Sequence, residues 1–184
     1  MAMNQANLPC GPEIPLPKGP KDARYVENIM EHAFLSEVLQ HCWFIRNHPV
    51  EVIRPDVDAG GYDIVLEADG RVRHVQLKSR WKKAAGPKVL KINSRLRKHQ
   101  DPCVVWIFWD ADPACQVTLR YMYSEKVIRH SELPEWPEPL NGAGTFELRR
   151  AHFLPNHLKT SDMPHYLKTS DVVTLLFGPP TAQA

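Results

Sequence analysis

Three polar side chains with complementary chemistry lie within residues 60–79: Asp63, Gln76 and Lys78. A carboxylate and an amide oxygen are hard ligands of the kind that Mg²⁺ or Mn²⁺ takes. The ammonium of Lys78 can hold an attacking water or offset the charge of a phosphate. Grouped around a hydrated metal ion, these groups suit the hydrolysis of a phosphodiester. The alternative is a solvent-facing polar strand that carries a surface salt bridge.

A β-hairpin is the element that would bring the three together. Asp69-Gly70 separates two β-rich runs, a strong signal for a tight turn. If these two residues form the loop, counting back along the strands places Asp63 opposite Gln76. Side chains alternate between faces, so Lys78 shares their face. The other face carries the apolar residues Ile64, Leu66, Val75 and Leu77.

A helix over residues 22–42 is expected upstream, with Asp22 as its N-cap. Its acidic residues include Glu27 and Glu31, which are four apart and share a side of the helix. Glu31 falls at the edge of the apolar stripe, where its carboxylate can point into a site beside the sheet. The alternative is a solvated helix acid. The stripe itself consists of Val26, Ile29, Met30, Ala33, Phe34 and Val38.

The remaining segments predict one domain over residues 22–178. A Pro-rich leader, residues 1–21, should be extended and poorly ordered because its prolines disfavour a helix, and residues 179–184 form a tail. Residues 103–109 are continuously apolar, as in a strand buried on both faces of an α/β sheet. Further strands are expected at 50–54 and 116–123, short helices at 93–99 and 171–177, and a loop at 131–144. Ser170 or Asp171 would cap the last helix.

Charge is distributed unevenly although the net charge is only +2. The window of residues 70–100 contains no Asp or Glu and is rich in Lys and Arg, which is the footprint expected of a surface for a polyanion. Trp81 lies among these cations, and we expect it to be in the core. A solvated basic face, or a contact with a protein partner, are the alternatives. The cations expected to bind nucleic acid are Arg80, Lys82, Lys83, Lys88, Lys91, Arg95 and Lys98.

The order of these features resembles the PD-(D/E)xK nuclease superfamily, in the variant with Gln-x-Lys in its last motif. The resemblance spans residues 25–109: a helix with a Glu, then Gly61-Tyr62-Asp63, a hairpin, and Val75-Gln76-Leu77-Lys78-Ser79. It implies an α/β, restriction-endonuclease-like α-β-β-β-α-β core, with a mixed central sheet of four or five strands flanked by helices. It also implies a Mg²⁺- or Mn²⁺-dependent deoxyribonuclease that acts on DNA, and many members act as dimers.

The resemblance assigns a role to each matching residue. Asp63 would be the central metal-binding acid, and Gln76 would add its side-chain oxygen. The backbone carbonyl of Leu77 would help to hold the metal, and Lys78 would position the nucleophilic water. Glu31 would be an outer ligand, through water in many members, with Glu27 as the substitute.

Two departures from the usual pattern leave alternatives open. The usual Glu is Gln76 here, which removes a negative charge from the metal site. This favours the rival hypothesis of a non-catalytic nucleic-acid-binding or assembly module on the same fold. The Pro-Asp dipeptide is Pro55-Asp56 rather than a pair ending at Asp63, and Asp58 could also reach the site because glycines follow it.

Other classes of function find little support in the sequence. Cys10, Cys42, Cys103 and Cys115 form no CxxC pair, so reduced thiols and a cytoplasmic location are expected. No apolar run is long enough to span a bilayer. The spacing of His152, His157 and His165 is too irregular to favour zinc.

Overall fold

The computed structural model describes residues 17–57, 60–84, 89–112, 116–125, 144–149, 153 and 166–180. The described chain is mixed α/β, as predicted, with two α-helices and a five-stranded mixed sheet. Its elements in order are α1 (Pro20–Phe44), β1 (Glu51–Ile53), β2 (Ile64–Ala68), β3 (Arg71–Trp81), β4 (Val89–Asn93), the 3₁₀-helix η1 (Ser94–Lys98), β5 (Pro102–Ala111), β6 (Val117–Ser124), β7 (Thr145–Arg149) and α2 (Thr169–Phe177).

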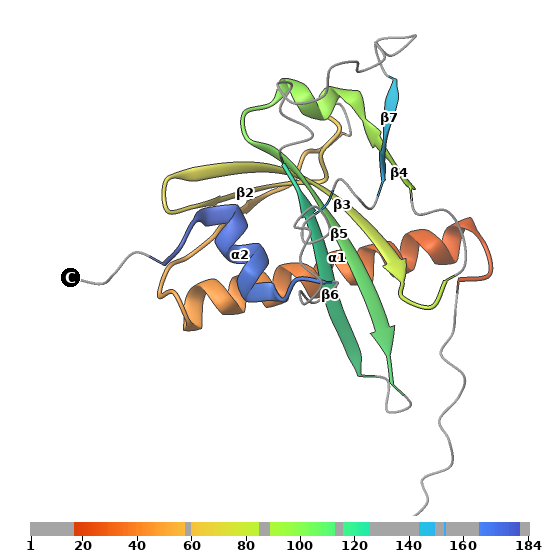
Figure 1. Ribbon diagram of the computed structural model, residues 1–184, viewed down its shortest axis with the longest axis horizontal. Coiled ribbons are helices and arrows are strands. Elements are labelled where there is room, and N and C mark those ends of the chain that lie inside the picture. Colours follow the sequence, from red (N-terminus) through yellow and green to blue (C-terminus); the bar gives the residue numbers. More distant parts are fainter. Residues whose placement is uncertain are drawn as a thin grey trace, which may run out of the picture.

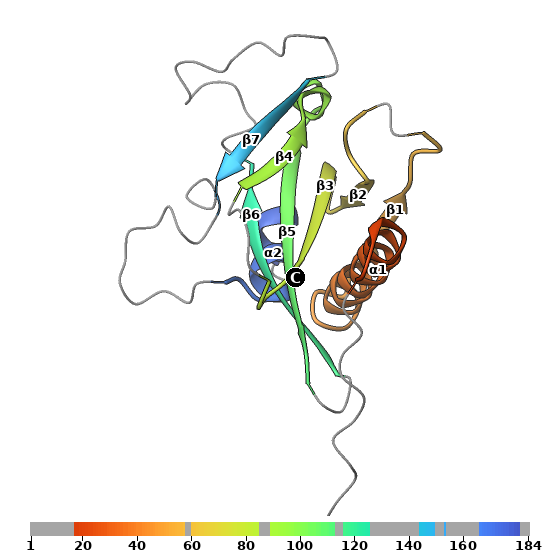
Figure 2. The same cartoon turned by 90° about the vertical axis from the view of Figure 1, so that its right-hand side faces the viewer.

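The main sheet has the strand order β1-β2-β3-β5-β6. Neighbouring strands are antiparallel except for β3 and β5, which are parallel. Both helices pack against one face of this sheet, and a second sheet of β4 and β7 covers the other face (Figures 1 and 2). The main sheet is therefore covered by helices on one face and by the second sheet on the other.

The predicted hairpin is confirmed in position and register. Ala68 pairs with Arg71, and the ladder continues back to the pair of Ile64 with Val75. Both turn residues have positive φ, +53° at Asp69 and +69° at Gly70. Such a turn follows the right-handed twist of the strands, which is why Asp-Gly specifies a two-residue hairpin.

The ladder stops before the pair that we expected between Asp63 and Gln76. The backbone N–H of Asp63 donates to the carbonyl of Val75, not to that of Gln76, at 2.9 Å. Asp63 lies in a bend after Gly61, whose φ of +75° turns the chain away from the strand direction. The register prediction therefore holds within β2 and is wrong by one residue at its entry.

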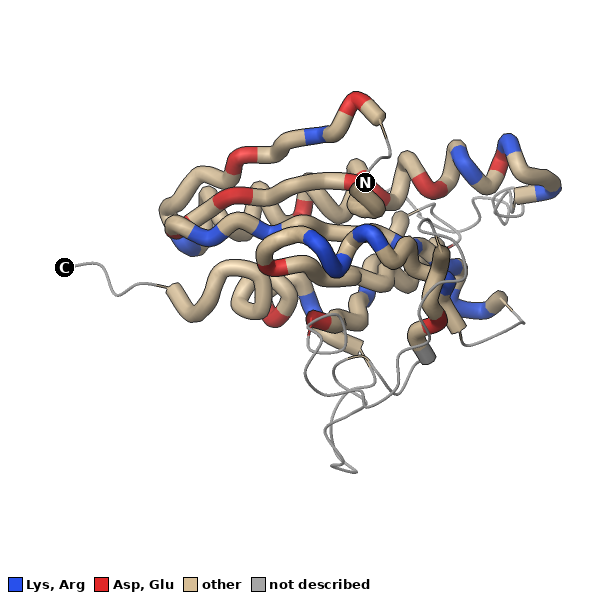
Figure 3. The backbone as a smooth tube through the Cα atoms, turned by 90° about the horizontal axis from the view of Figure 1, so that it is seen from above, with Lys and Arg blue, Asp and Glu red and all other residues tan. Residues whose placement is uncertain are grey.

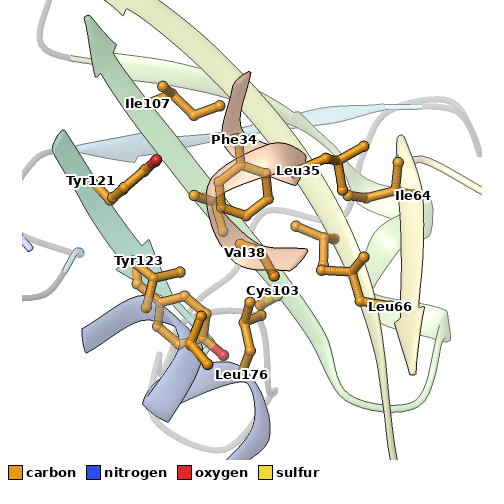
Figure 4. Packing of buried hydrophobic residues seen from close by; sticks show 14 of the residues in the cluster. Phe34, Leu35, Val38, Ile64, Leu66, Cys103, Ile107, Tyr121, Tyr123 and Leu176 are labelled. Atoms are coloured by element: carbon orange, nitrogen blue, oxygen red, sulfur yellow. The ribbon is translucent and has the colours of Figure 1, made fainter. Parts of the chain in front are cut away.

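The larger core lies between the sheet and the two helices (Figure 4). Phe34 and Val38 of α1 are fully buried against it. The apolar face of the hairpin lies here as predicted, and the Trp81 side chain packs at its edge. Neither helix of the described chain is long and apolar enough to cross a bilayer. The hairpin and α1 residues labelled in the core are Phe34, Leu35, Val38, Ile64 and Leu66.

A smaller core lies between β5 and β6 on one side and β4, β7 and η1 on the other. Strand β5 belongs to both cores, with Val105 and Ile107 facing the helices and Val104 and Trp106 facing the second sheet. This double burial explains the continuous apolar run of residues 103–109. We did not predict β4 or β7. The former lies within the basic segment, and the latter follows the predicted loop at 131–144, nearly all of which lies outside the described residues.

Both helices begin earlier than predicted. Gly19 is the N-cap of α1 and Pro20 its first residue, because the fixed φ of proline suits a first turn in which no N–H bond is needed. Asp22 instead accepts a bond from the Lys18 N–H. Helix α2 has Lys168 as its N-cap, and Asp171 lies in the first turn, where its carboxylate accepts from the Lys168 N–H at 2.8 Å. Asp22 and Asp171 therefore lie in the first turn of their helices rather than at the N-cap, and each accepts a hydrogen bond from a backbone N–H that precedes it.

The turn of the hairpin is tied to the carboxyl-terminal ends of both helices. The Arg46 side chain, 4% exposed, follows α1 and forms an ion pair with Asp69 at 2.7 Å. Its guanidinium also donates to the carbonyl of Gly178, which ends α2, at 2.8 Å. The other carboxylate oxygen of Asp69 lies 3.1 Å from Nε2 of His48. Three segments far apart in sequence are thus joined at one end of the sheet.

Candidate active site

A cavity of about 170 Å³ opens at the other end of the hairpin. Strand β2 pairs only with the first half of β3, which continues alone on that edge to Trp81. The amino-terminal half of α1 runs past the end of β3 (Figure 1), and residues of both elements line the cavity. The lining residues are Arg24, Glu27, Asn28, Glu31, Asp63, Leu77, Lys78, Ser79 and Ile107.

Asp63 is fixed at the point where β2 begins. One of its carboxylate oxygens, Oδ2, accepts a hydrogen bond from the backbone N–H of Leu77 at 2.6 Å. Its own N–H bonds to Val75, so two bonds hold it against the edge of β3. Backbone groups of alternate residues point to the same edge of a strand, so the carbonyl of Leu77 faces the cavity as well.

Lys78 lines the cavity from β3 and is half-buried. Its parallel partner is Trp106, a residue of the second core, so alternation gives its side chain the same face as Gln76. Within the described chain, no acidic group lies within ion-pairing distance of its ammonium. An ammonium that no carboxylate neutralises is able to bind a phosphate or a water. Three of the predicted site residues, Asp63, Lys78 and Glu31, therefore line one cavity, as does Leu77, whose carbonyl was the predicted backbone ligand.

The helix contributes both of its candidate acids to the same cavity. Glu31 and Glu27 line it one turn apart. Glu31 is largely buried and forms an ion pair with Arg54, which follows β1. Sequence reasoning did not identify Arg54, because nothing in its surroundings along the chain relates it to a helix acid. Asp56 is exposed, and Asp58 lies outside the described residues.

Gln76 is the predicted ligand that the structure places apart from this cavity. It is 7% exposed and is not among the lining residues. Its parallel partner is Val104, a residue of the second core, so alternation directs its side chain away from α1. In the described chain, Gln76 Oε1 is buried and has no hydrogen-bond partner, which is costly for a polar atom.

The residues that line the cavity fit a hydrated Mg²⁺ or Mn²⁺ ion. Carboxylates of Asp63 and Glu31 and the carbonyl of Leu77 are hard oxygen donors at one edge. The described residues contain no group of three or more His, Cys, Asp or Glu side chains gathered as for a metal. A site with few protein ligands suits magnesium, which keeps several of its waters, and the cavity has room for them.

An aromatic cluster supports the loop that carries Asp63. Tyr62 lies edge-on to the rings of His74 and His99, with ring centroids at 4.9 and 4.8 Å. The two imidazoles stack at 4.6 Å, and Nε2–H of His99 donates to the carbonyl of Gly60 at 3.0 Å. Burial first, and then the charge of His74, lower the pKa of His99, whereas the bond to Gly60 raises it. The sequence gives no sign of this cluster, because its rings come from separate elements.

Acid is expected to destabilise the protein through His99. The fold favours the neutral imidazole, so the unfolded chain binds its proton more readily, and the free energy of unfolding falls once pH drops below the ordinary value of 6.5. Thermal unfolding of wild type and His99→Gln, followed between about pH 5 and pH 8, measures this dependence. A matched change at the exposed His32 should leave the slope unchanged. An equal slope in wild type and His99→Gln would contradict the assignment.

The exposed lysines of the basic window, residues 70–100, lie on two separate parts of the structure. Lys82 and Lys83 are exposed after the free end of β3, and Lys83 lies 3.7 Å from Asp110. Lys91 and Lys98 are exposed on β4 and η1, on the face away from α1. Along α1 both signs of charge are present, and in the view of Figure 3 blue and red segments both occur along this helix. Arg80 and Arg95 are half-buried in the described chain, and Lys88 lies outside it.

Two other candidates of the sequence, Cys42 and Cys103, are not among the residues that line the cavity. Cys42 and Cys103 are buried free thiols, and burial raises the pKa of Cys103 to about 12. Such a thiol stays protonated at neutral pH and is a poor nucleophile. Cys10, Cys115, His152, His157 and His165 lie outside the described residues.

Comparison of the chain with protein-family models, with curated proteins and with solved structures gave no match. The case for a function therefore depends on the cavity and its residues.

Proposed function

We propose that this protein is a metal-dependent nuclease of the PD-(D/E)xK type that hydrolyses phosphodiester bonds in DNA. The observation that carries the proposal is the meeting of Asp63, Glu31 and Lys78 at one cavity. These residues come from a strand entry, a helix and a second strand, and they combine two carboxylates with a lysine. This combination suits metal-assisted phosphodiester hydrolysis.

The strand order supports a restriction-endonuclease-like core. Helix α1 precedes an antiparallel meander of β1, β2 and β3, and β5 then lies parallel to β3. The crossover between these parallel strands contains β4 and η1 in place of the expected α-helix. Asn93 caps η1, its side chain accepting from the Arg95 N–H at 3.0 Å, and η1 packs on the face opposite α1.

Each residue at the cavity has a task in the proposed reaction. Asp63 and Glu31 would hold the divalent ion, together with the carbonyl of Leu77. The bound ion would neutralise the charge that develops on the phosphate. The Lys78 ammonium would bind and orient the attacking water, and the exposed cations Lys82 and Lys83 would bind neighbouring phosphates.

Nicking of supercoiled plasmid in the presence of Mg²⁺ or Mn²⁺ tests the role of Lys78. The variant Lys78→Ala should lose about 10²-fold in rate, because a positioned polar group contributes about that much in the transition state. Lys168→Ala removes an exposed lysine distant from the cavity and should cut at the wild-type rate. If Lys78→Ala nicks DNA as fast as wild type, Lys78 has no part in the chemistry.

A non-catalytic module that binds nucleic acid is the second candidate, and the position of Gln76 favours it. An uncharged residue replaces the usual acid, and it lies outside the cavity. Such a module should bind DNA with a steep dependence on salt but give no heat of Mn²⁺ binding. Calorimetry of the wild-type protein with Mn²⁺ distinguishes the two functions.

A further inference from the structure

The carboxylate of Glu31 already has a partner, the guanidinium of Arg54. The two side chains differ in exposure, with Arg54 at 47% and Glu31 at 18%. Glu31 lines the cavity, and Arg54 does not. One side of the ion pair therefore faces solvent, where a large ligand would arrive, and the other side faces the proposed metal site.

This ion pair opposes the role of Glu31 as a metal ligand. A carboxylate that is neutralised by a guanidinium attracts a divalent cation less strongly, and the positive charge of Arg54 repels the same ion. Guanidinium also binds phosphate, with the same planar donor geometry that it offers to a carboxylate. An incoming phosphodiester can therefore compete with Glu31 for Arg54.

We propose that Arg54 is a positioning residue that holds Glu31 until a backbone phosphate of nucleic acid takes its place. The exchange leaves the carboxylate of Glu31 available to the divalent ion when the substrate is bound. Metal binding and DNA binding would then strengthen one another. The inference rests on the proposed nuclease function, and it adds to that function a coupling between substrate and metal.

The first test is calorimetric titration of the full-length protein with Mn²⁺ alone. The variant Arg54→Ala should bind Mn²⁺ about tenfold more tightly, because it frees the Glu31 carboxylate as a ligand and removes a positive charge that repels the ion. Arg24→Ala is the matched control, because Arg24 also lines the cavity and has no ion pair with Glu31 among the described contacts. It should tighten binding by about twofold at most, through charge alone. Equal effects of the two changes would overturn the proposal.

The second test repeats the Mn²⁺ titration with a short duplex of mixed sequence present. Lys78→Ala serves as the background so that cutting of the duplex is slowed about 10²-fold. The duplex should tighten Mn²⁺ binding about tenfold when Arg54 is present and leave it unchanged in the double variant with Arg54→Ala. A duplex that changes neither protein, or both equally, overturns the coupling while the metal site stands. Absence of Mn²⁺ binding in every protein overturns the nuclease function and this inference together.

Discussion

Replacement of Asp63 by Asn is expected to lower the plasmid-nicking rate about 10³-fold, the largest effect on activity that the proposed site predicts. The asparagine has nearly the shape of aspartate, and its amide oxygen can still accept the bond from the Leu77 N–H. The substitution can therefore keep the entry of β2 in place while it removes the negative charge and one of the two carboxylate oxygens. Nicking is measured with Mg²⁺ and with Mn²⁺, alongside the thermal unfolding midpoint as a check on the fold.

The same chemical change at Glu67 is the control for Asp63. Glu67 is an exposed acid on β2, on the same strand that Asp63 precedes. Glu67→Gln should nick plasmid at the wild-type rate. If Asp63→Asn keeps more than about a tenth of the wild-type rate, the cavity is not the metal site, because loss of a central ligand costs far more.

Replacement of Arg73 by Met is expected to have the largest effect on stability, a loss of about 3–5 kcal/mol. Arg73 is only 6% exposed and belongs to the basic window, yet it is not available to a polyanion. Its guanidinium donates to the carbonyls of Leu176 and Leu175 at 2.7 and 3.1 Å, and to Glu125 at 3.1 Å. Methionine fills much of the volume but removes the cation beside Glu125, which keeps its bond from the Tyr123 hydroxyl, and removes the donor to the last carbonyls of α2.

Urea unfolding of Arg73→Met and Arg71→Met compares a buried with an exposed arginine on one strand. Arg71 is exposed, so its replacement should change the free energy of unfolding by at most about 0.5 kcal/mol. The slope of each transition shows whether both variants unfold from the same compact state. A loss of less than about 1 kcal/mol in Arg73→Met would mean that these bonds do not fasten α2 to the hairpin.

Features that depend on neighbours along the chain were predictable from the sequence. Asp69-Gly70 specified the turn and through it the pairing of β2 with β3, because a two-residue loop leaves one register. The apolar run from Cys103 to Trp109 identified the strand shared by two cores. The pairing of β4 with β7 was not predictable, since its partners are far apart in sequence and Lys91 interrupts the apolar residues of β4.

Several residues that line the candidate site were predicted from the sequence, but their geometry was not. Spacing along β3 identified Lys78, and helical periodicity identified Glu31. The expected pairing of Asp63 with Gln76 extended the β2–β3 ladder by one residue. The chain bends after Gly61, so Asp63 lies outside that ladder. Arg54 reaches Glu31 only through the packing of β1 against the sheet, which no local pattern records.

The tie formed by Arg46, Asp69 and Gly178 fastens α1 at one end only. No residue of α1 before Met30 is buried, so the turns that carry Arg24 and Glu27 contribute little to the core. The free energy needed for local opening therefore decreases along the helix from its fastened end toward the cavity. We therefore expect the part of α1 that lines the cavity to move more readily than the hairpin and the sheet. The DNA of the proposed function would then be accommodated at one end of the helix, while the other end maintains the fold.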